Sequence, residues 1–263
     1  VTVAHFPARP QETVPFQLKR CVQQAIAQHT GDVLCFLPGK HELDQCARVL
    51  TDLDAEVLSL HGELSVDEQA RVLRPGDGRR VVLATNVAES SVTLPGVRVV
   101  IDSGLAREPR LDGGSGMSRL ETVNIAQSSA TQRAGRAGRV AEGWCYRLWP
   151  ESQRLEPGTR PEIARTELAA FVLELKQWGA DGLRLLDAPP PAAQAAAVAL
   201  LQALDALDGD GRITPHGKKL LAFGTHPRIA NLLVAGRFET LDLSAFGWQR
   251  VIDGQPMREI NVV

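Results

Sequence analysis

Three arginines recur at every third position in Gln132–Arg139, which reads QRAGRAGR. On a helix or a turn, this spacing would bring Arg133, Arg136 and Arg139 near one side, and the glycines between them would leave room for a ligand. A merely solvated helix face would rarely contain two glycines, because each costs about 1 kcal/mol relative to alanine. Guanidinium is always protonated and offers a planar fork of donors, so the segment predicts contact with a phosphoryl group during its transfer.

Polar residues also follow two of the apolar runs that resemble strands. Gly39 and Lys40 come after Val33–Leu37, and His61–Glu63 come after Glu56–Leu60. The ends of strands in an α/β sheet are where ligands usually bind. Taken alone, however, Lys40 is more typical of a solvated lysine than of a ligand contact.

The elements that must position these residues alternate short β-branched runs with helical patterns over the first two thirds of the chain. This alternation is typical of α/β proteins with a parallel sheet and helices on both faces. The predicted strands are Val33–Leu37, Glu56–Leu60, Arg80–Ala84, Val97–Asp102 and, as a late edge strand, Trp144–Trp149. The predicted helices are Val14–Gln28, His41–Leu53 and Ser65–Leu73. The glycine-rich loop inside Leu111–Asn124 predicts a hairpin that projects from the sheet.

The pattern changes near Pro157 and Pro161, and the rest of the chain is mostly helical. The predicted helices are Ile163–Trp178, Ala192–Leu207 and Pro215–Phe223, with Gly211–Thr214 as the candidate strand of a wing. We therefore expect an α/β domain at residues 1–157, a smaller winged-helix domain at 158–225, and a further helical region or irregular tail at 226–263.

Composition narrows the class of protein. The formal net charge of -2 excludes a strongly basic domain, so contacts with phosphates must come from a local cluster. The four cysteines include no C-x-x-C pair and are expected to be reduced core residues. No apolar run reaches the roughly 18 residues that a membrane span needs, and no signal-peptide pattern opens the chain. We therefore expect a cytoplasmic protein without a membrane partner.

QRAGRAGR resembles motif VI of the DEAH-box helicases of superfamily 2, and the similarity extends over about residues 1–235. The segment ATNVAESSVT at Ala84–Thr93 is similar to their motif V, and VLCFLPGKHEL at Val33–Leu43 is similar to their motif IV. The segment PEIARTEL at Pro161–Leu168 resembles the entry to their winged-helix domain, and THPRIANLLV at Thr225–Val234 resembles the bacterial HrpB branch. The resemblance implies the second RecA-like lobe and the winged helix of an RNA helicase.

The resemblance also implies roles at the nucleotide. Arg136 and Arg139 match the arginine fingers that face ATP. Gln132 matches the glutamine that orients the attacking water. Ser91 matches a serine that senses the γ-phosphate, and a hydroxyl suits that task because it can donate or accept a hydrogen bond.

Four further residues match positions that hold the nucleic-acid backbone. They are Gly39, Lys40, Thr85 and Thr93. Contacts with phosphate and sugar position a strand without reading its bases. The implied partner is therefore single-stranded RNA, bound independently of its sequence.

A complete motor needs a loop of the form G-x-x-x-x-G-K-[ST] around the phosphates and an acidic pair for magnesium, and neither pattern occurs in this sequence. We therefore expect ATP and Mg²⁺ to be shared with an N-terminal RecA-like lobe of the same polypeptide, with no metal ligand in this chain. Alone, the chain is expected to be inactive as an ATPase. Leu94 and Leu73 replace an aspartate and an aromatic residue that are common in the family, so base recognition should be weak.

Two other classes of function compete with a helicase motor. The helices over residues 161–225 are also typical of a non-catalytic winged-helix module that binds nucleic acid, although the third of them carries only the basic pair Lys218 and Lys219. An adaptor derived from an inactivated helicase is the second alternative, but motifs V and VI are intact. The motifs favour the motor.

Overall fold

The computed structural model describes residues 1–90, 92–114, 116–139, 141–180 and 182–235, and four short strands beyond them. These strands are β9 (Leu241–Asp242), β10 (Arg250–Ile252), β11 (Gln255–Met257) and β12 (Glu259–Ile260). The chain forms two compact units. The first comprises Val1–Glu108 and Leu120–Arg160, and the second comprises Pro109–Arg119 and Pro161–Val263.

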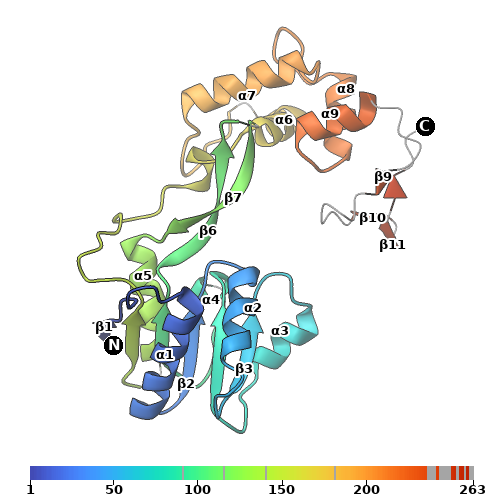
Figure 1. Ribbon diagram of the computed structural model, residues 1–263. Helices are drawn as coiled ribbons and strands as arrows, with labels where there is room; N and C mark the ends of the chain where they lie inside the picture. Colours follow the sequence, from blue (N-terminus) through green and yellow to red (C-terminus); the bar gives the residue numbers. More distant parts are fainter. Residues whose placement is uncertain are drawn as a thin grey trace. The chain divides into compact units, whose positions relative to one another are not determined.

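The first unit is built on a parallel sheet, which has six strands in the described part of the chain (Figure 1). The strands are β1 (Thr2–His5), β2 (Asp32–Phe36), β3 (Glu56–Leu60), β4 (Arg80–Ala84), β5 (Val97–Asp102) and β8 (Trp144–Arg147). Their order is β1-β8-β5-β2-β4-β3, and every neighbouring pair is parallel. The predicted parallel α/β architecture is confirmed.

The strand predicted at Trp144–Trp149 is present, but its predicted place at the edge of the sheet was wrong. Strand β8 ends at Arg147 and lies between β1 and β5, so β1 forms that edge of the sheet. Strand β1 was not predicted because it has only four residues, and most of their side chains are exposed. Such a strand lacks the buried β-branched run that identified the others.

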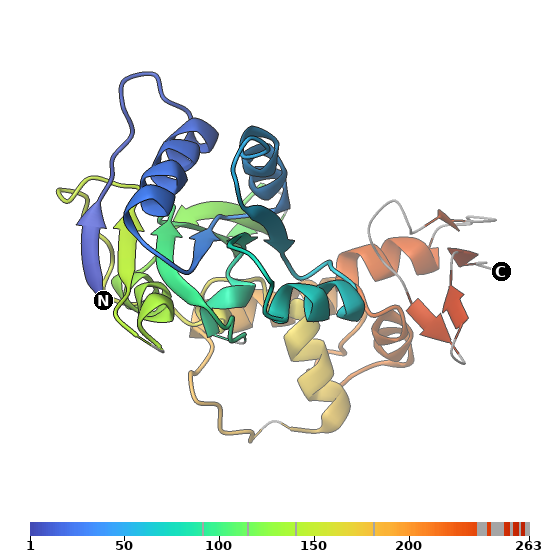
Figure 2. The ribbon, with the colours of Figure 1, turned by 90° about the horizontal axis from the view of Figure 1, so that it is seen from below.

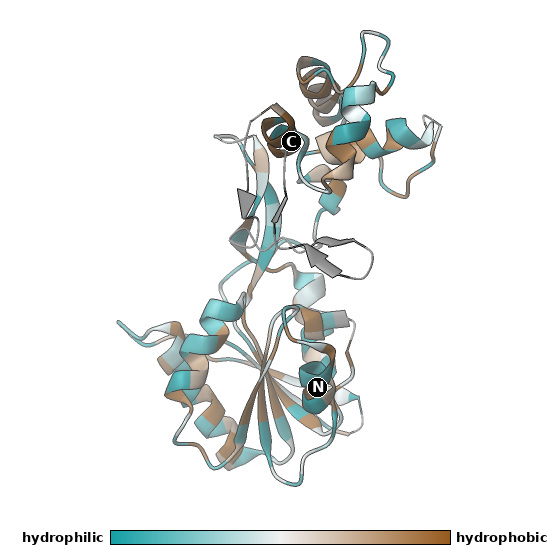
Figure 3. Ribbon diagram, turned by 90° about the vertical axis from the view of Figure 1, so that its right-hand side faces the viewer, coloured by the Kyte–Doolittle hydropathy of each residue, from teal (hydrophilic) through white to brown (hydrophobic). Residues whose placement is uncertain are grey.

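Helices cover both faces of this sheet (Figure 2). One face packs against α1 (Val14–Gln28) and α2 (Lys40–Val49). The other packs against α3 (Val66–Leu73), α4 (Val87–Ser90), α5 (Gln127–Ala134) and the 3₁₀-helix η1 (Gly135–Gly138). Successive strand residues alternate between the two cores, as Cys35 and Phe36 do in β2. The strands are therefore apolar on both faces, and Figure 3 shows them mostly as hydrophobic.

The four cysteines are buried and free, which confirms the prediction of reduced core residues. They are Cys21, Cys35, Cys46 and Cys145. Burial raises the pKa of every thiol, to about 12 for Cys46 and Cys145, so all four are neutral near pH 7.

A hairpin follows β5 directly and comprises β6 (Leu105–Asp112) and β7 (Met117–Asn124) (Figure 1). It begins earlier than the predicted Leu111–Asn124. Gly116 in its turn has a φ of 65°, a left-handed conformation that favours glycine. The tip of the hairpin, Pro109–Arg119, belongs to the second unit.

The second unit is mostly helical, as predicted. It contains η2 (Glu162–Ala164), α6 (Ala169–Trp178), α7 (Pro191–Ala203), α8 (Pro215–Ala222) and α9 (Pro227–Ala235). Leucine, alanine and valine side chains from α6 to α9 form its core. No helix in the described residues is both long and apolar enough to cross a membrane.

Several boundaries in this unit differ from the predictions. Helix α6 begins at Ala169, whose N–H donates to the Glu167 carboxylate at 2.8 Å. Helix α7 ends at Ala203, shortly before Asp205 adopts a φ of 54°. In place of the predicted wing strand Gly211–Thr214 there is a single bridge between Leu207 and Ile213. Most of the predicted tail after Ala235 lies outside the described residues.

Candidate functional site

The carboxyl ends of β2, β3 and β4 meet at one edge of the sheet. Phe36 and Leu60, the last residues of β2 and β3, both pair with Ala84 at the end of β4. The next residues therefore lie near one another. The N–H of Thr85 donates to the carbonyl oxygen of Leu60 at 3.1 Å. Gly39, Lys40 and Thr85, which are predicted to contact the nucleic-acid backbone, thus lie at the same carboxyl ends of the strands. This is where ligands usually bind in a parallel sheet.

Gly39 is the N-cap residue of α2, and no side chain caps this helix. Free N–H groups in the first turn of a helix favour bound phosphate. A Cβ at Gly39 would lie 2.8 Å from Nε of Arg107, so this arginine packs directly on the glycine backbone. Lys40 is exposed, and its Nζ lies 2.8 Å from Oε2 of Glu63. This pairing raises the pKa of Lys40 and lowers that of Glu63.

Arg133 is not accessible to a ligand, although the motif VI arginines were predicted to contact a phosphoryl group. It lies in α5, and its side chain is completely buried. Its Nε donates to Oε2 of Glu89 at 2.8 Å, and its Nη1 donates to Oδ1 of Asp102 at 2.9 Å. Burial raises the pKa of Asp102 even though Arg133 opposes this shift. Two carboxylates therefore hold Arg133 inside the protein.

Arg136 and Arg139 contact the end of motif V. Nη1 of Arg136 donates to the carbonyl oxygen of Val92 at 2.6 Å, and its Nη2 donates to the carbonyl oxygen of Glu89. Nη1 of Arg139 donates to Oγ1 of Thr93 at 2.5 Å. Arg136 is only 7% exposed, whereas Arg139 is exposed. Burial and the neighbouring Arg139 lower the pKa of Arg136.

The prediction that the three arginines lie near one side was therefore wrong for Arg133. The chain tightens from α5 into η1 at Gly135. A 3₁₀-helix has three residues per turn, which aligns residues three apart, whereas in an α-helix each step of three residues leaves them offset by about 60°. Arg136 and Arg139 consequently stay together, and Arg133 turns into the core.

The remaining predicted residues are placed as follows. Gln132 is exposed on α5. Thr93 lies with the arginines of η1, and Ser91 lies outside the described residues. Sequence analysis missed Glu89 and Asp102. Glu89 is an acidic residue inside motif V, and Asp102 is an acidic residue at the end of an apolar strand. Neither position indicates a role until the burial of Arg133 is known.

The comparisons with known proteins identify two domain families. Residues 17–141 match the helicase conserved C-terminal domain, and residues 197–224 match the winged-helix helicase associated domain HA2. The chain is 38% identical over 224 residues to the ATP-dependent RNA helicase HrpB of Escherichia coli, covering 81% of this chain and 28% of HrpB. It is 35% identical over 234 residues to the pre-mRNA-splicing factor ATP-dependent RNA helicase prp22 of Schizosaccharomyces pombe, covering 82% of this chain and 20% of that relative.

The fold agrees with these sequence matches. A crystal structure of the Escherichia coli DEAH/RHA helicase HrpB superposes with a TM-score of 0.82 at 35% identity, covering 90% of this chain and 32% of that one. The predicted RecA-like sheet and the following helical region are thereby confirmed. The chain belongs to the DEAH-box helicases, of which it contains the C-terminal RecA-like domain and the helicase-associated winged helix.

Proposed function

We propose that this chain is the C-terminal half of the motor of an ATP-dependent RNA helicase. The contacts of Arg136 and Arg139 with motif V carry the proposal, because they join the predicted phosphate-binding residues to a segment predicted to hold nucleic acid. HrpB and prp22 are ATP-dependent RNA helicases by their descriptions. The chain spans only 28% and 20% of their lengths, so the activity is proposed for the whole protein.

Gln132, Arg136 and Arg139 would form one wall of the nucleotide site. Their amide and guanidinium N–H groups suit a triphosphate, because charge-assisted hydrogen bonds to phosphate are strong. Bound ATP with Mg²⁺ would supply the γ-phosphoryl group that is transferred to water. Arg136 and Arg139 would stabilise the charge on that group, and Gln132 would orient the water. Ser91 would sense the γ-phosphate.

Arg136 needs to change its partners to reach a phosphate. Its guanidinium donates to two main-chain carbonyl oxygens, of Glu89 and Val92. Phosphate oxygens are stronger acceptors than carbonyl oxygens because they are charged. A nucleotide that approaches η1 would therefore draw Arg136 away from motif V, while Arg139 is already exposed.

RNA would lie along the carboxyl ends of β2 and β4. Main-chain N–H groups at Gly39 and the hydroxyl of Thr85 suit its phosphates and sugars. Lys40 would exchange Glu63 for a phosphate, and Thr93 would join these contacts from the end of motif V. Such contacts do not read bases, so binding would be independent of sequence.

An N-terminal RecA-like lobe of the same polypeptide would supply the phosphate-binding loop and the magnesium ligands. Nucleotide held between the two lobes would close them, and its hydrolysis would let them open. RNA bound across both lobes would then be moved in steps. Motif V is suited to couple the two events, since Thr85 lies near its start and Thr93 ends it beside Arg139.

The test is Arg136→Ala in the full-length helicase. An arginine finger contributes roughly 10³- to 10⁵-fold to the hydrolysis rate, so RNA-stimulated ATP hydrolysis should fall by about that factor while RNA affinity changes little. The exposed Arg48→Ala in α2 serves as a control for the loss of a positive charge. Equal losses of hydrolysis and of RNA affinity would show instead that Arg136 mainly holds RNA.

A further inference from the structure

Arg133 is the centre of a buried ionic cluster made by three separate elements. Glu89 comes from α4, Asp102 ends β5, and Arg133 comes from α5. The carbonyl oxygen of Leu105, at the start of the hairpin, accepts a further bond from Nη1 of Arg133 at 3.2 Å. The guanidinium carbon lies 4.8 Å from the centre of the Phe36 ring. The cluster therefore ties motif VI to motif V and to the base of the hairpin.

The cluster is not optimised for stability. Among the described residues, Oδ2 of Asp102 and Nη2 of Arg133 are buried without a hydrogen-bond partner. A buried polar atom that lacks a partner is costly, and an apolar replacement for a buried ion pair is often no less stable. Retaining these charges is better explained by a requirement for a defined geometry.

Glu89 contacts two arginines of motif VI, the buried Arg133 and Arg136 of the candidate site. Its carboxylate accepts the Nε–H of Arg133, and its main-chain carbonyl accepts an N–H of Arg136. The same residue is thus fixed through its side chain and fixes Arg136 through its backbone. Val92, three residues further along motif V, provides the other acceptor for Arg136 at 2.6 Å. Any displacement of α4 would therefore move the Glu89 carbonyl that holds Arg136.

We propose that Glu89 is a positioning residue for Arg136, and that its salt bridge to Arg133 keeps the backbone of motif V where it holds Arg136 beside the nucleotide site, ready to exchange its carbonyl partners for a phosphate. This proposal rests on the proposed role of Arg136 at the nucleotide. Loss of the Glu89 charge would leave the fold in place but let the α4 backbone shift. Arg136 would then be misplaced, which would lower the catalytic rate more than nucleotide affinity.

A second buried pair provides a matched control. Nη2 of Arg80 lies 2.5 Å from Oδ2 of Asp32, and their side chains are 3% and 10% exposed. Arg80 begins β4 and Asp32 begins β2, whereas Asp102 ends β5. This second pair therefore lies at the amino ends of the parallel strands, and the cluster around Arg133 lies at their carboxyl ends. Asp32→Asn removes one buried carboxylate charge, as Glu89→Gln does, but this carboxylate accepts its hydrogen bonds from Arg80 and not from Arg133.

The experiment is a double-mutant cycle in the full-length helicase with Glu89→Gln and Arg136→Ala. Glu89→Gln should lower kcat for RNA-stimulated ATP hydrolysis by about tenfold to a hundredfold, the range that a small misplacement of a catalytic group causes, with KM for ATP nearly unchanged. In the Arg136→Ala background it should lower kcat no further. Asp32→Asn should lower the unfolding temperature without changing kcat of the folded enzyme.

Three results would overturn the proposal. If Glu89→Gln leaves kcat unchanged where Arg136→Ala lowers it, Glu89 does not position Arg136. If the two losses multiply in the double variant, Glu89 acts independently of Arg136. Unchanged hydrolysis in Arg136→Ala alone would reject the proposed function of Arg136, and the positioning role with it. If Glu89→Gln does not fold, Glu89→Asp replaces it in the same cycle, because it keeps the charge but shortens the reach to Arg133.

Discussion

Two glycines beside the arginine cluster have very different surroundings. A Cβ at Gly143 would lie 2.2 Å from the carbonyl oxygen of Ala137 in η1, which is a backbone atom and cannot rotate away. A Cβ at Gly135, the first residue of η1, would meet nothing within 4 Å, and its φ is -58°. The backbone of motif VI thus packs on Gly143, although that residue lies outside the motif.

We expect Gly143→Ala to destabilise the protein by about 1–3 kcal/mol, as overpacking commonly does, because the η1 backbone would have to move. Gly135→Ala should be neutral or slightly stabilising, since alanine adopts this conformation without strain. Urea unfolding of both variants measures the difference. Equal midpoints for the two variants would contradict the packing of η1 on Gly143.

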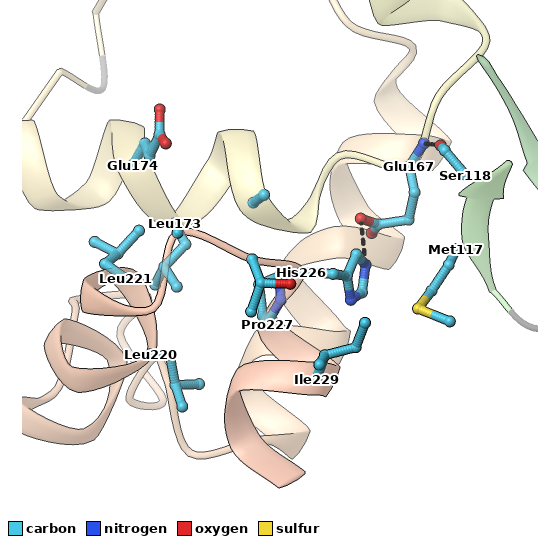
Figure 4. A pocket seen from close by; sticks show the side chains of 13 residues that line it. Met117, Ser118, Glu167, Leu173, Glu174, Leu220, Leu221, His226, Pro227 and Ile229 are labelled. Atoms are coloured by element: carbon cyan, nitrogen blue, oxygen red, sulfur yellow. Dashed lines mark hydrogen bonds and ion pairs between the residues drawn. The ribbon is translucent and has the colours of Figure 1, made fainter. Parts of the chain in front are cut away.

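At the scale of elements, Glu167 joins three parts of the second unit (Figure 4). Its main-chain N–H donates to Oγ of Ser118 in β7 at 2.8 Å, and its carboxylate accepts the N–H of Ala169, the first residue of α6. Nε2 of His226, just before α9, lies 2.9 Å from Oε2 of Glu167. These contacts line one side of a cleft of about 560 Å³ between the hairpin tip, α6, α8 and α9.

Burial opposes ionisation of Glu167, but the bonds from His226 and from the Ala169 N–H outweigh it and lower the pKa of Glu167 below its ordinary value of 4.5. A carboxylate whose pKa is lowered by folding stabilises the native state above its unfolded pKa, and this contribution disappears as the pH falls through the folded pKa. Between pH 7 and pH 3, the unfolding temperature should therefore fall more steeply for the native protein than for Glu167→Gln.

Thermal unfolding followed by circular dichroism at several pH values measures this difference. Asp210→Asn serves as the control, because that carboxylate forms an exposed ion pair with Arg212 in the same unit. Parallel pH profiles for the native protein and Glu167→Gln would show that the carboxylate contributes nothing to the stability of this junction.

At the scale of the whole molecule, the chain combines a RecA-like domain with a helicase-associated winged helix. Of the arginines of the proposed nucleotide site, Arg136 lies in η1 and Arg139 directly follows it, but the sequence contains no G-x-x-x-x-G-K-[ST] loop. Phosphates bound only by arginines would lack the backbone cradle and the magnesium that hydrolysis requires. The proposed motor therefore depends on a second lobe.

We accordingly expect the 263-residue chain alone to show no ATPase activity above background, with or without RNA. A phosphate-release assay on repurified protein, whose folding is checked by circular dichroism, measures this. Activity that survives repurification and is lost in Arg136→Ala would refute the expected need for a second lobe. Activity that persists in Arg136→Ala would indicate a contaminating enzyme.

The sequence alone determined most of the architecture. Strands β3, β4 and β5 begin and end where predicted. The runs in β4 and β5 are mostly apolar because both strands are buried on both faces, whereas β3 forms an edge of the sheet and is only partly buried. Motifs IV, V and VI are each a contiguous run of residues, so the order of amino acids by itself identifies the family. The same local signals placed helix α1 at Val14–Gln28.

Only the tertiary structure decided which charges are buried and which face solvent. Arg133 and Arg139 belong to the same repeat, yet one is enclosed by Glu89 and Asp102 and the other is exposed. The partners of Arg133 lie 44 and 31 residues away in the chain, so no local pattern could reveal them. The position of β8 inside the sheet was likewise set by β1, a distant strand with no apolar signal of its own. Contacts between residues far apart in the chain form only when the sheet assembles. These contacts fix which side chains of a motif are buried and which are exposed.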